Sequence, residues 1–327
     1  MSVEQRINAA WYGRPAWLLL LLPLMVLFRV VASLRRYVIT SRSCGAPVIV
    51  VGNISVGGSG KTPAVLALAE FCRNRGFRVG IVSRGYGGKA PYYPYLLDEN
   101  STPSMAGDEP CLISRRSGLP VAIAPDRLAA ATLLVEQQQC DIIISDDGLQ
   151  HYRLARDIEV LLVDGQRGFG NGYCLPVGPL REPIERASTV DLTIINGGSD
   201  TLVGYTMTLT GDTALNLVSG EKCDLCDWPE SQRRIHAVAG IGNPSRFFTA
   251  LRNKGFDVIE HPFADHHAFR SVDVSFDDTH PVIMTEKDAV KCAPFALENT
   301  WSLPVDADID TAFFAEFAKL LERLPAP

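Results

Sequence analysis

The chain has 327 residues, of which 46% are hydrophobic and 21% charged, a composition that indicates a globular protein with a substantial core. Its net charge of −6 argues against a general nucleic-acid-binding protein, since such proteins present basic surfaces. The charge is uneven, because residues 1–42 hold six arginines against one glutamate, a net charge of +5 that leaves −11 for the rest.

The most apolar stretch of the sequence lies inside this basic N-terminal region. Residues 16–28 carry no charge, and Arg29 interrupts the pattern before further apolar residues. A membrane-spanning helix needs about 20 apolar residues, whereas runs of roughly 10–14 more often lie at the interface or in a core. We predict that residues 1–36 form a helix in or dipping into one leaflet, with arginines on anionic lipid. A signal peptide, a single-pass anchor and an ordinary buried helix remain alternatives.

A short apolar strand (residues 48–51) then runs into a glycine-rich loop that ends Gly60-Lys61-Thr62 and is followed by a helical pattern. This is a phosphate-binding loop in its expected setting. Its amides would hold phosphate oxygens, Lys61 would reach the β- and γ-phosphates, and the Thr62 hydroxyl would hold Mg²⁺. Ser55 stands where the usual pattern has its first glycine. The predicted nucleotide-binding residues are Ser55, Val56, Gly57, Gly58, Ser59, Gly60, Lys61 and Thr62.

Short β-branched runs alternate with helical patterns along the rest of the chain, which predicts an α/β fold: a mostly parallel sheet with helices on both faces. A second, shorter βα series follows, and an amphipathic helix is expected over residues 310–324. The predicted units are an N-terminal membrane-anchor helix (1–36), a P-loop core (37–215) and a smaller C-terminal α/β subdomain (216–327).

Three acidic or histidine-containing segments are candidates for chemistry. A strand over residues 142–145 ends in Asp146 and Asp147, which places carboxylates near a P-loop magnesium ion, so the predicted metal set is Thr62, Asp146 and Asp147. Asp108 lies in a glycine-flanked acidic pair, a pattern that by itself favours a solvated turn over a functional site. His266 lies in Asp265-His266-His267, which is a metal pair, a catalytic histidine or a surface turn.

The eight scattered cysteines indicate reduced thiols, and residues 223–226 form only a lone C-x-x-C.

Taken together, the motifs resemble the tetraacyldisaccharide 4′-kinase family, the lipid A 4′-kinases. The resemblance covers nearly the whole chain, including the apolar N-terminus, and that family's P-loop also lacks the first glycine. The segments that carry it are residues 52–63, 83–87, 107–110, 145–151, 180–183, 265–266 and 284–292.

The resemblance implies a reaction and a setting. ATP, with Mg²⁺, would donate its γ-phosphate to the 4′-hydroxyl of a tetraacyldisaccharide 1-phosphate, giving lipid IVA on the cytoplasmic face of the bacterial inner membrane. Asp108 matches the family's catalytic aspartate and His266 the histidine that supports it, with Lys61 as the third catalytic residue. The chain would be a peripheral or monotopic protein that contacts lipid and no nucleic acid.

Other classes of protein remain possible from the residues. One is a P-loop transferase or ligase that acts on a soluble metabolite, which would leave the apolar N-terminus unexplained. Another is a GTPase-like switch, although Lys287 abuts Asp288 where a guanine-specificity motif has a residue between them. A third is a membrane-recruited ATP-binding scaffold that transfers no group. The sequence gives no oligomeric state.

Overall fold

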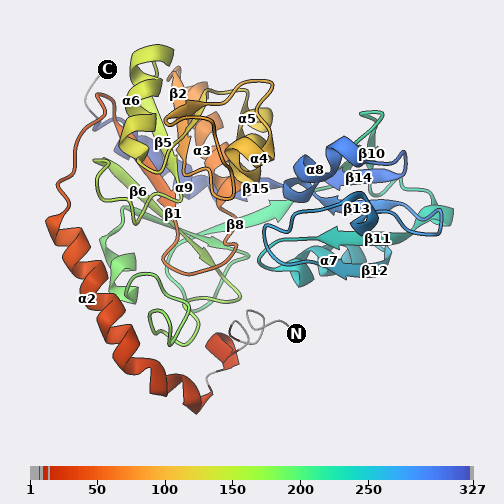
Figure 1. The fold of residues 1–327 in the computed structure, drawn as a ribbon, viewed down its shortest axis with the longest axis horizontal. Helices are drawn as coiled ribbons and strands as arrows, with labels where there is room; N and C mark the ends of the chain where they lie inside the picture. The colour runs from red at the N-terminus through yellow and green to blue at the C-terminus, as the bar shows by residue number, and fades with distance from the viewer. Residues whose placement is uncertain (1–6, 8–9, 14, 325–327) are drawn as a thin grey trace.

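The computed structural model describes residues 7, 10–13 and 15–324, which form two β-sheets flanked by helices (Figure 1). The first sheet has nine strands in the order β15-β8-β7-β6-β1-β5-β2-β4-β3. Only β3 and β15 run antiparallel to their neighbours, so the sheet is mostly parallel, as predicted. Its strands are β1 (Val48–Gly52), β2 (Val79–Ser83), β3 (Tyr95–Leu96), β4 (Val121–Ile123), β5 (Ile142–Asp146), β6 (Ile158–Asp164), β7 (Leu192–Asn196), β8 (Tyr205–Thr210) and β15 (Asp306–Ile309).

Both faces of the central strands are buried, and alternate residues feed two different cores. Ile49 and Val51 of β1 pack with helices α3 (Lys61–Asn74), α5 (Asp108–Ser117) and α9 (Thr311–Leu321). Val48 and Val50 face the opposite way, toward helix α6 (Arg127–Gln138) and the N-terminal segment. Continuous β-branched runs are what a sheet covered on both sides requires. The predicted fold class is therefore confirmed, with the P-loop after β1.

The second sheet has six strands in the order β10-β9-β14-β13-β11-β12. Helices α7 (Pro244–Asn253) and α8 (Glu286–Cys292) accompany it, and Figure 1 shows it beside the first sheet, with α8 near α4 (Pro103–Ala106) and α5. Its strands are β9 (Thr213–Asn216), β10 (Lys222–Asp224), β11 (Arg234–Ala239), β12 (Asp257–Pro262), β13 (Val282–Thr285) and β14 (Thr300–Leu303).

The strands divide between the two sheets differently from the predicted units 37–215 and 216–327. β8 leads out of the first sheet, β9 already belongs to the second, and the chain then returns through β15 to pair with β8. The final helix, α9, packs on the first core through Phe313 and Phe317. The connection between the sheets is thus a pair of antiparallel strands, and the end of the chain completes the larger unit. As a domain boundary, position 215 stays a prediction.

The N-terminal apolar stretch is helical, as a 3-10 turn η1 (Ala16–Leu21) that continues into α2 (Leu22–Val38). These 23 residues contain an 18-residue window with a mean hydropathy of 2.3 and are long and apolar enough to cross a membrane, judged by length and composition alone. Residues 1–6, 8–9 and 14 of the predicted anchor lie outside the described part. Seven exposed apolar residues recur every three or four positions, and we call them the exposed stripe: Trp17, Leu20, Leu24, Leu27, Val31, Leu34 and Val38.

A candidate phosphoryl-transfer site

The glycine-rich loop joins β1 to α3 at the carboxyl edge of the first sheet, where neighbouring segments fix its backbone. The amide of Val56 donates to the Pro179 carbonyl (2.8 Å), and the side-chain amide of Asn196 donates to the Ser59 carbonyl (3.1 Å). Gly60 has a φ of 87°, and a Cβ there would lie 2.5 Å from Asn196 Nδ2. Only glycine adopts this positive φ readily and also leaves room for the Asn196 side chain. The loop amides are thereby held near the N-terminus of α3, an arrangement that favours phosphate.

Ser55 can replace the usual glycine because this position is extended. It pairs in an isolated antiparallel bridge with Leu180, and the amide of Arg181 donates to the Ile54 carbonyl (2.7 Å). A side chain is tolerated in such a conformation without strain. The loop therefore needs no glycine at position 55 to adopt its backbone conformation.

Asp146, at the end of β5, is 1% exposed and only half satisfied. Its Oδ2 accepts a hydrogen bond from Ser83 Oγ (3.1 Å), while Oδ1 has no partner among the described residues. Burial, and then the negative charges of Glu109 and Asp147, raise the pKa of Asp146 to about 7. A divalent cation would give Oδ1 its partner and favour the ionised form. The residues present therefore fit Mg²⁺.

Asp147 has a different environment, since cations surround it. Lys61 Nζ lies 3.7 Å from Oδ1, Arg181 Nη1 lies 3.0 Å from Oδ2, and Arg127 Nη2 donates to the backbone carbonyl (3.0 Å). Burial would raise the pKa of Asp147, but the charges of Lys61 and Arg181 outweigh it and lower the pKa to about 2. The backbone is left-handed here, with φ 48°. Asp147 is therefore ionised at neutral pH and shared between a P-loop cation and a loop arginine.

The second cluster brings together two residues 158 positions apart. His266 Nδ1 lies 3.1 Å from Asp108 Oδ2 and 3.2 Å from Oδ1. Asp108 is 6% exposed, at the start of α5; burial would raise its pKa, but the hydrogen bond from His266 and the charge of Lys287 lower it to about 2. The same hydrogen bond is the largest reason why the pKa of His266 is raised. The contact therefore favours an ionised Asp108 carboxylate and a protonated His266 ring.

Two lysines of α8 hold this unit in place. Lys287 Nζ contacts Glu109 (2.9 Å) and Asp265 (3.1 Å), and Lys291 Nζ lies 3.7 Å from Asp108. These contacts tie α5 of the first unit to segments around the second sheet. Both lysines stand in motifs that carried the family resemblance, but their pattern alone assigned them no role. Ser83, Arg127 and Asn196 were likewise not predicted, since side chains that act through another residue leave no local signal.

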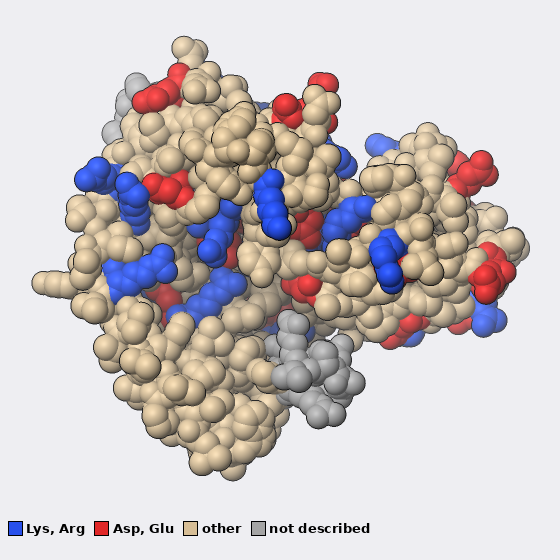
Figure 2. All heavy atoms as spheres, in the orientation of Figure 1, with Lys and Arg blue, Asp and Glu red and all other residues tan. Residues whose placement is uncertain are grey.

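One cavity of about 1,270 Å³ joins these groups. Its lining includes residues 56–62, Asp146, Asp147 and His266, whereas Ser55 and Asp108 are not among the lining residues. Its wall continues to α2 through Phe28, Val31, Ala32 and Arg35. In Figure 2, Lys and Arg side chains gather around a hollow in this face, and the lower lobe, toward which α2 descends, carries no coloured charge.

The structure therefore places most of the predicted site residues around one cavity, with Asp108 in contact with His266. A metal site at residues 265–267 gains no support, since in the described part of the chain no three His, Cys, Asp or Glu side chains are grouped to hold an ion. That Asp146 and Asp147 hold Mg²⁺, and that Asp108 and His266 are catalytic, stay predictions.

A family model described as "Tetraacyldisaccharide-1-P 4'-kinase" matches residues 17–322. The chain belongs to this family. A tetraacyldisaccharide 4′-kinase of Colwellia psychrerythraea is 53% identical over 323 residues, 94% of each chain. One of Pseudomonas aeruginosa is 49% identical over the full length of both chains. A crystal structure of LpxK from Aquifex aeolicus in complex with ATP has a TM-score of 0.76 at 27% identity, covering 94% of this family member and 99% of that chain.

Proposed function

We propose that this chain transfers the γ-phosphoryl group of ATP to the 4′-hydroxyl of a tetraacyldisaccharide 1-phosphate, giving lipid IVA. The observation that carries the proposal is the shared cavity. It contains a P-loop with Lys61, a buried half-satisfied carboxylate and a His–Asp pair, and it opens toward an exposed apolar helix. Family membership indicates the reaction, and the cavity has room for both the nucleotide and the sugar end of the lipid.

The nucleotide end of the cavity stabilises charge. Lys61 and the amides of residues 57–60 would contact the β- and γ-phosphate oxygens, where they compensate the charge that builds up in phosphoryl transfer. Mg²⁺, when bound, neutralises phosphate charge and would be held by Thr62 and Asp146, whose free Oδ1 faces no other partner in the described chain. Asp147 pairs with Lys61 (3.7 Å) and would hold a water ligand of the ion.

The Asp108–His266 pair would accept the proton of the sugar hydroxyl. A hydroxyl is a weak nucleophile, so orientation and late proton acceptance contribute more than covalent chemistry. We assign acceptance to the Asp108 carboxylate and its orientation to His266 Nδ1. His266 lines the cavity and the buried Asp108 does not, so direct contact between the hydroxyl and the carboxylate requires a small rearrangement of the cavity wall.

The apolar helix would bring the enzyme to its lipid. The exposed stripe follows one face of η1 and α2, and Val31 belongs both to it and to the cavity wall. Acyl chains could therefore stay in the bilayer while the disaccharide enters the cavity. Met25 is buried and Arg36 lies over the Tyr152 ring (5.5 Å), so part of the helix packs on the protein. These contacts favour a monotopic association over a free span, and the nucleotide requirement favours the cytoplasmic face of the inner membrane.

Membrane binding is tested by vesicle flotation. Replacing Leu20 and Leu27 together with Glu should release the chain from anionic vesicles and raise the KM for lipid, because two exposed apolar contacts are lost and negative charge is added. A matched control is the pair Val203→Glu and Val272→Glu, two exposed apolar residues away from the helix. Equal vesicle binding of wild type and the helix variant would contradict the membrane proposal.

The reaction is tested with labelled ATP and two kinds of acceptor, the tetraacyldisaccharide 1-phosphate and soluble sugars. Label is expected only on the lipid, at the 4′ position, and only with Mg²⁺. Label on a soluble acceptor would instead support a metabolite transferase. Hydrolysis with no transfer would favour a nucleotide switch or scaffold.

A further inference from the structure

Helix α8 carries a buried carboxylate that the proposed reaction does not use. Asp288 is fully buried, and its Oδ2 accepts hydrogen bonds from Thr285 Oγ1 (2.6 Å) and from the Gly240 amide (2.8 Å). Its Oδ1 lies 2.9 Å from Lys291 Nζ, three residues later on the same helix. A buried negative charge is costly unless a positive charge compensates it. Lys291 is therefore the counter-ion that allows Asp288 to be buried.

Lys291 lies between this carboxylate and the carboxylate of Asp108. Its Nζ lies 3.7 Å from Asp108 Oδ2, farther than from Asp288 Oδ1, and 4.9 Å from the centroid of the Phe269 ring. Only 12% of the side chain is exposed, and Nζ forms no aligned hydrogen bond with the described residues. The ammonium group therefore acts through its charge, and the attraction of Asp288 sets its distance from Asp108.

The pKa of Asp108 is consistent with a lysine whose charge is already matched. Burial would raise that pKa, and the hydrogen bond from His266 and the charge of Lys287 lower it more than the charge of Lys291 does. A lysine without a partner of its own would be drawn toward Asp108 and would bind the oxygen that must accept the proton. Asp288 thus keeps Lys291 near enough to favour the ionised form of Asp108 and too far to occupy its oxygens.

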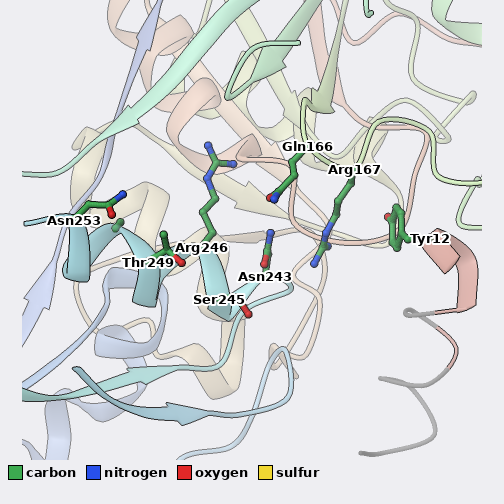
Figure 3. Close-up of a pocket in the computed structure, with 9 residues that line it drawn as sticks. Tyr12, Gln166, Arg167, Asn243, Ser245, Arg246, Thr249 and Asn253 are labelled. Atoms are coloured by element: carbon green, nitrogen blue, oxygen red, sulfur yellow. The ribbon is translucent and has the colours of Figure 1, made fainter. Parts of the chain in front are cut away.

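Asp288 also contacts the turn that follows β11. A Cβ built on Gly240 would lie 3.1 Å from Asp288 Oδ1, and one built on Gly242 would lie 2.8 Å from the Gly58 amide of the P-loop. Arg167 Nη2 donates to the Gly242 carbonyl (3.1 Å), and Figure 3 shows the Arg167 side chain extending toward this turn. One short turn therefore contacts both the nucleotide end of the cavity and the buried carboxylate of α8.

We propose that Asp288 and Lys291 are positioning residues for the reaction: Lys291 orients the Asp108 carboxylate through its charge, and Asp288 fixes both Lys291 and the turn beside the P-loop. This inference rests on the proposed function, since it takes Asp108 to accept the proton. Neither Asp288 nor Lys291 lines the cavity, so neither contacts substrate. Their loss should therefore change turnover rather than binding.

The test uses steady-state kinetics of the full-length protein with labelled ATP and the lipid acceptor. Lys291→Met removes the charge and keeps the length of the side chain, whereas Lys291→Arg keeps the charge. The double variant Asp288→Asn/Lys291→Met removes both charges, so no unpaired carboxylate stays buried if the single variant fails to fold. The matched control is Glu316→Gln/Lys319→Met, an exposed acid–lysine pair with the same spacing on α9.

Lys291→Met and the double variant should each lower kcat by about tenfold to a hundredfold, the scale of a misplaced catalytic group, with KM for ATP and for lipid within about twofold of wild type. Lys291→Arg should keep most of the turnover, because it retains the charge. The control should match wild type in both kcat and KM. Wild-type kcat in both Lys291→Met and the double variant, or a change confined to KM, would overturn the inference.

An Asp108→Asn background separates positioning from a structural role. If Lys291 acts through the Asp108 carboxylate, adding Lys291→Met to Asp108→Asn should lower kcat by less than about twofold further, because residues that act as one unit are not additive. The same loss in both backgrounds would mean a structural role and would overturn the inference. Wild-type turnover in Asp108→Asn alone would instead remove the proposed proton acceptor, and with it the role of Lys291.

Discussion

The two ends of the reaction cavity are built in different ways. The phosphate-binding end is one contiguous segment, residues 53–62, fixed by bonds to other loops at the edge of the first sheet. The proton-accepting end joins Asp108 of α5 to His266, 158 residues away, and lysines of α8 hold it together. The first end is complete within one sheet, whereas the second exists only while the two units are in contact. Nucleotide binding and proton acceptance should therefore be separable by mutation.

The largest effect is expected at the contiguous end. Lys61→Ala should lower kcat by about 10³-fold or more, because the transferring phosphoryl group loses its fixed cation. Steady-state kinetics measure this, with Lys319→Ala on α9, an exposed lysine paired with Glu316, as the control. A folded Lys61→Ala protein with wild-type turnover would show that the loop does not bind the reacting phosphates.

Asp108→Ala and His266→Ala should each lower kcat by about 10²-fold to 10⁴-fold, the range for general-base catalysis, with ATP binding largely intact. The double variant should be little worse than the worse single variant, since residues that act as one unit are not additive. Asp278→Ala is the control, because Asp278 pairs with His236 (3.0 Å) away from the cavity. Additive losses would mean two independent roles and break the description of this end as a unit.

Metal dependence distinguishes the two acids at the end of β5. Asp146→Asn should raise the Mg²⁺ concentration for half-maximal activity by about tenfold or more, because a neutral amide replaces a buried anionic ligand. Asp147→Asn should act mainly on kcat, because its carboxylate pairs with Lys61 and Arg181. Asp141→Asn, paired with Arg78 beside the opposite end of β5, is the control. Identical magnesium titrations for wild type and Asp146→Asn would remove Asp146 from the metal site.

The contrast also explains what could be predicted from sequence. The P-loop, β5 and the central strands were readable because each is specified by neighbouring residues, through glycine conformation or continuous apolar runs. The pairing of Asp108 with His266 was not, since the pattern around Asp108 favours a solvated turn and the pattern around His266 is also typical of a surface turn. The resemblance to the family connected the two motifs, and in the structure His266 Nδ1 lies 3.1 Å from Asp108 Oδ2.

Other features depend on tertiary contacts that leave no local pattern. Residues 203–230 are polar and threonine-rich, yet they contain β8, β9 and β10. β8 is a strand because it pairs with β7 and also with β15, about a hundred residues later, through Leu209 and Ala307. Tyr12 and residues of α7, more than two hundred positions apart, line one pocket of about 590 Å³, and no spacing in the sequence indicates that arrangement.

The smallest expected effect is a pH-dependent contribution of the Asp108–His266 contact to stability. The folded-state pKa of Asp108 is lowered from 3.8 to about 2, so its stabilisation is present above pH 3.8 and is lost as the pH falls toward 2. The pKa of His266 is raised above 6.5, so its share is present below pH 6.5 and is lost as the pH rises through the folded value. The contact is therefore strongest between about pH 4 and 6.5.

A double-mutant cycle with Asp108→Asn and His266→Gln, measured by urea unfolding, tests this window. The coupling free energy should be about 1–2 kcal/mol at pH 5, in line with the lowered pKa of Asp108, and clearly smaller at pH 9. Asp108→Asn keeps the shape of the side chain and His266→Gln keeps a polar side chain of similar length, so the packing of α5 against α8 is little disturbed. A coupling that is the same at both pH values would show that the contact is an uncharged hydrogen bond. The proton-accepting end would then be held by α8 and its lysines rather than by the pair itself.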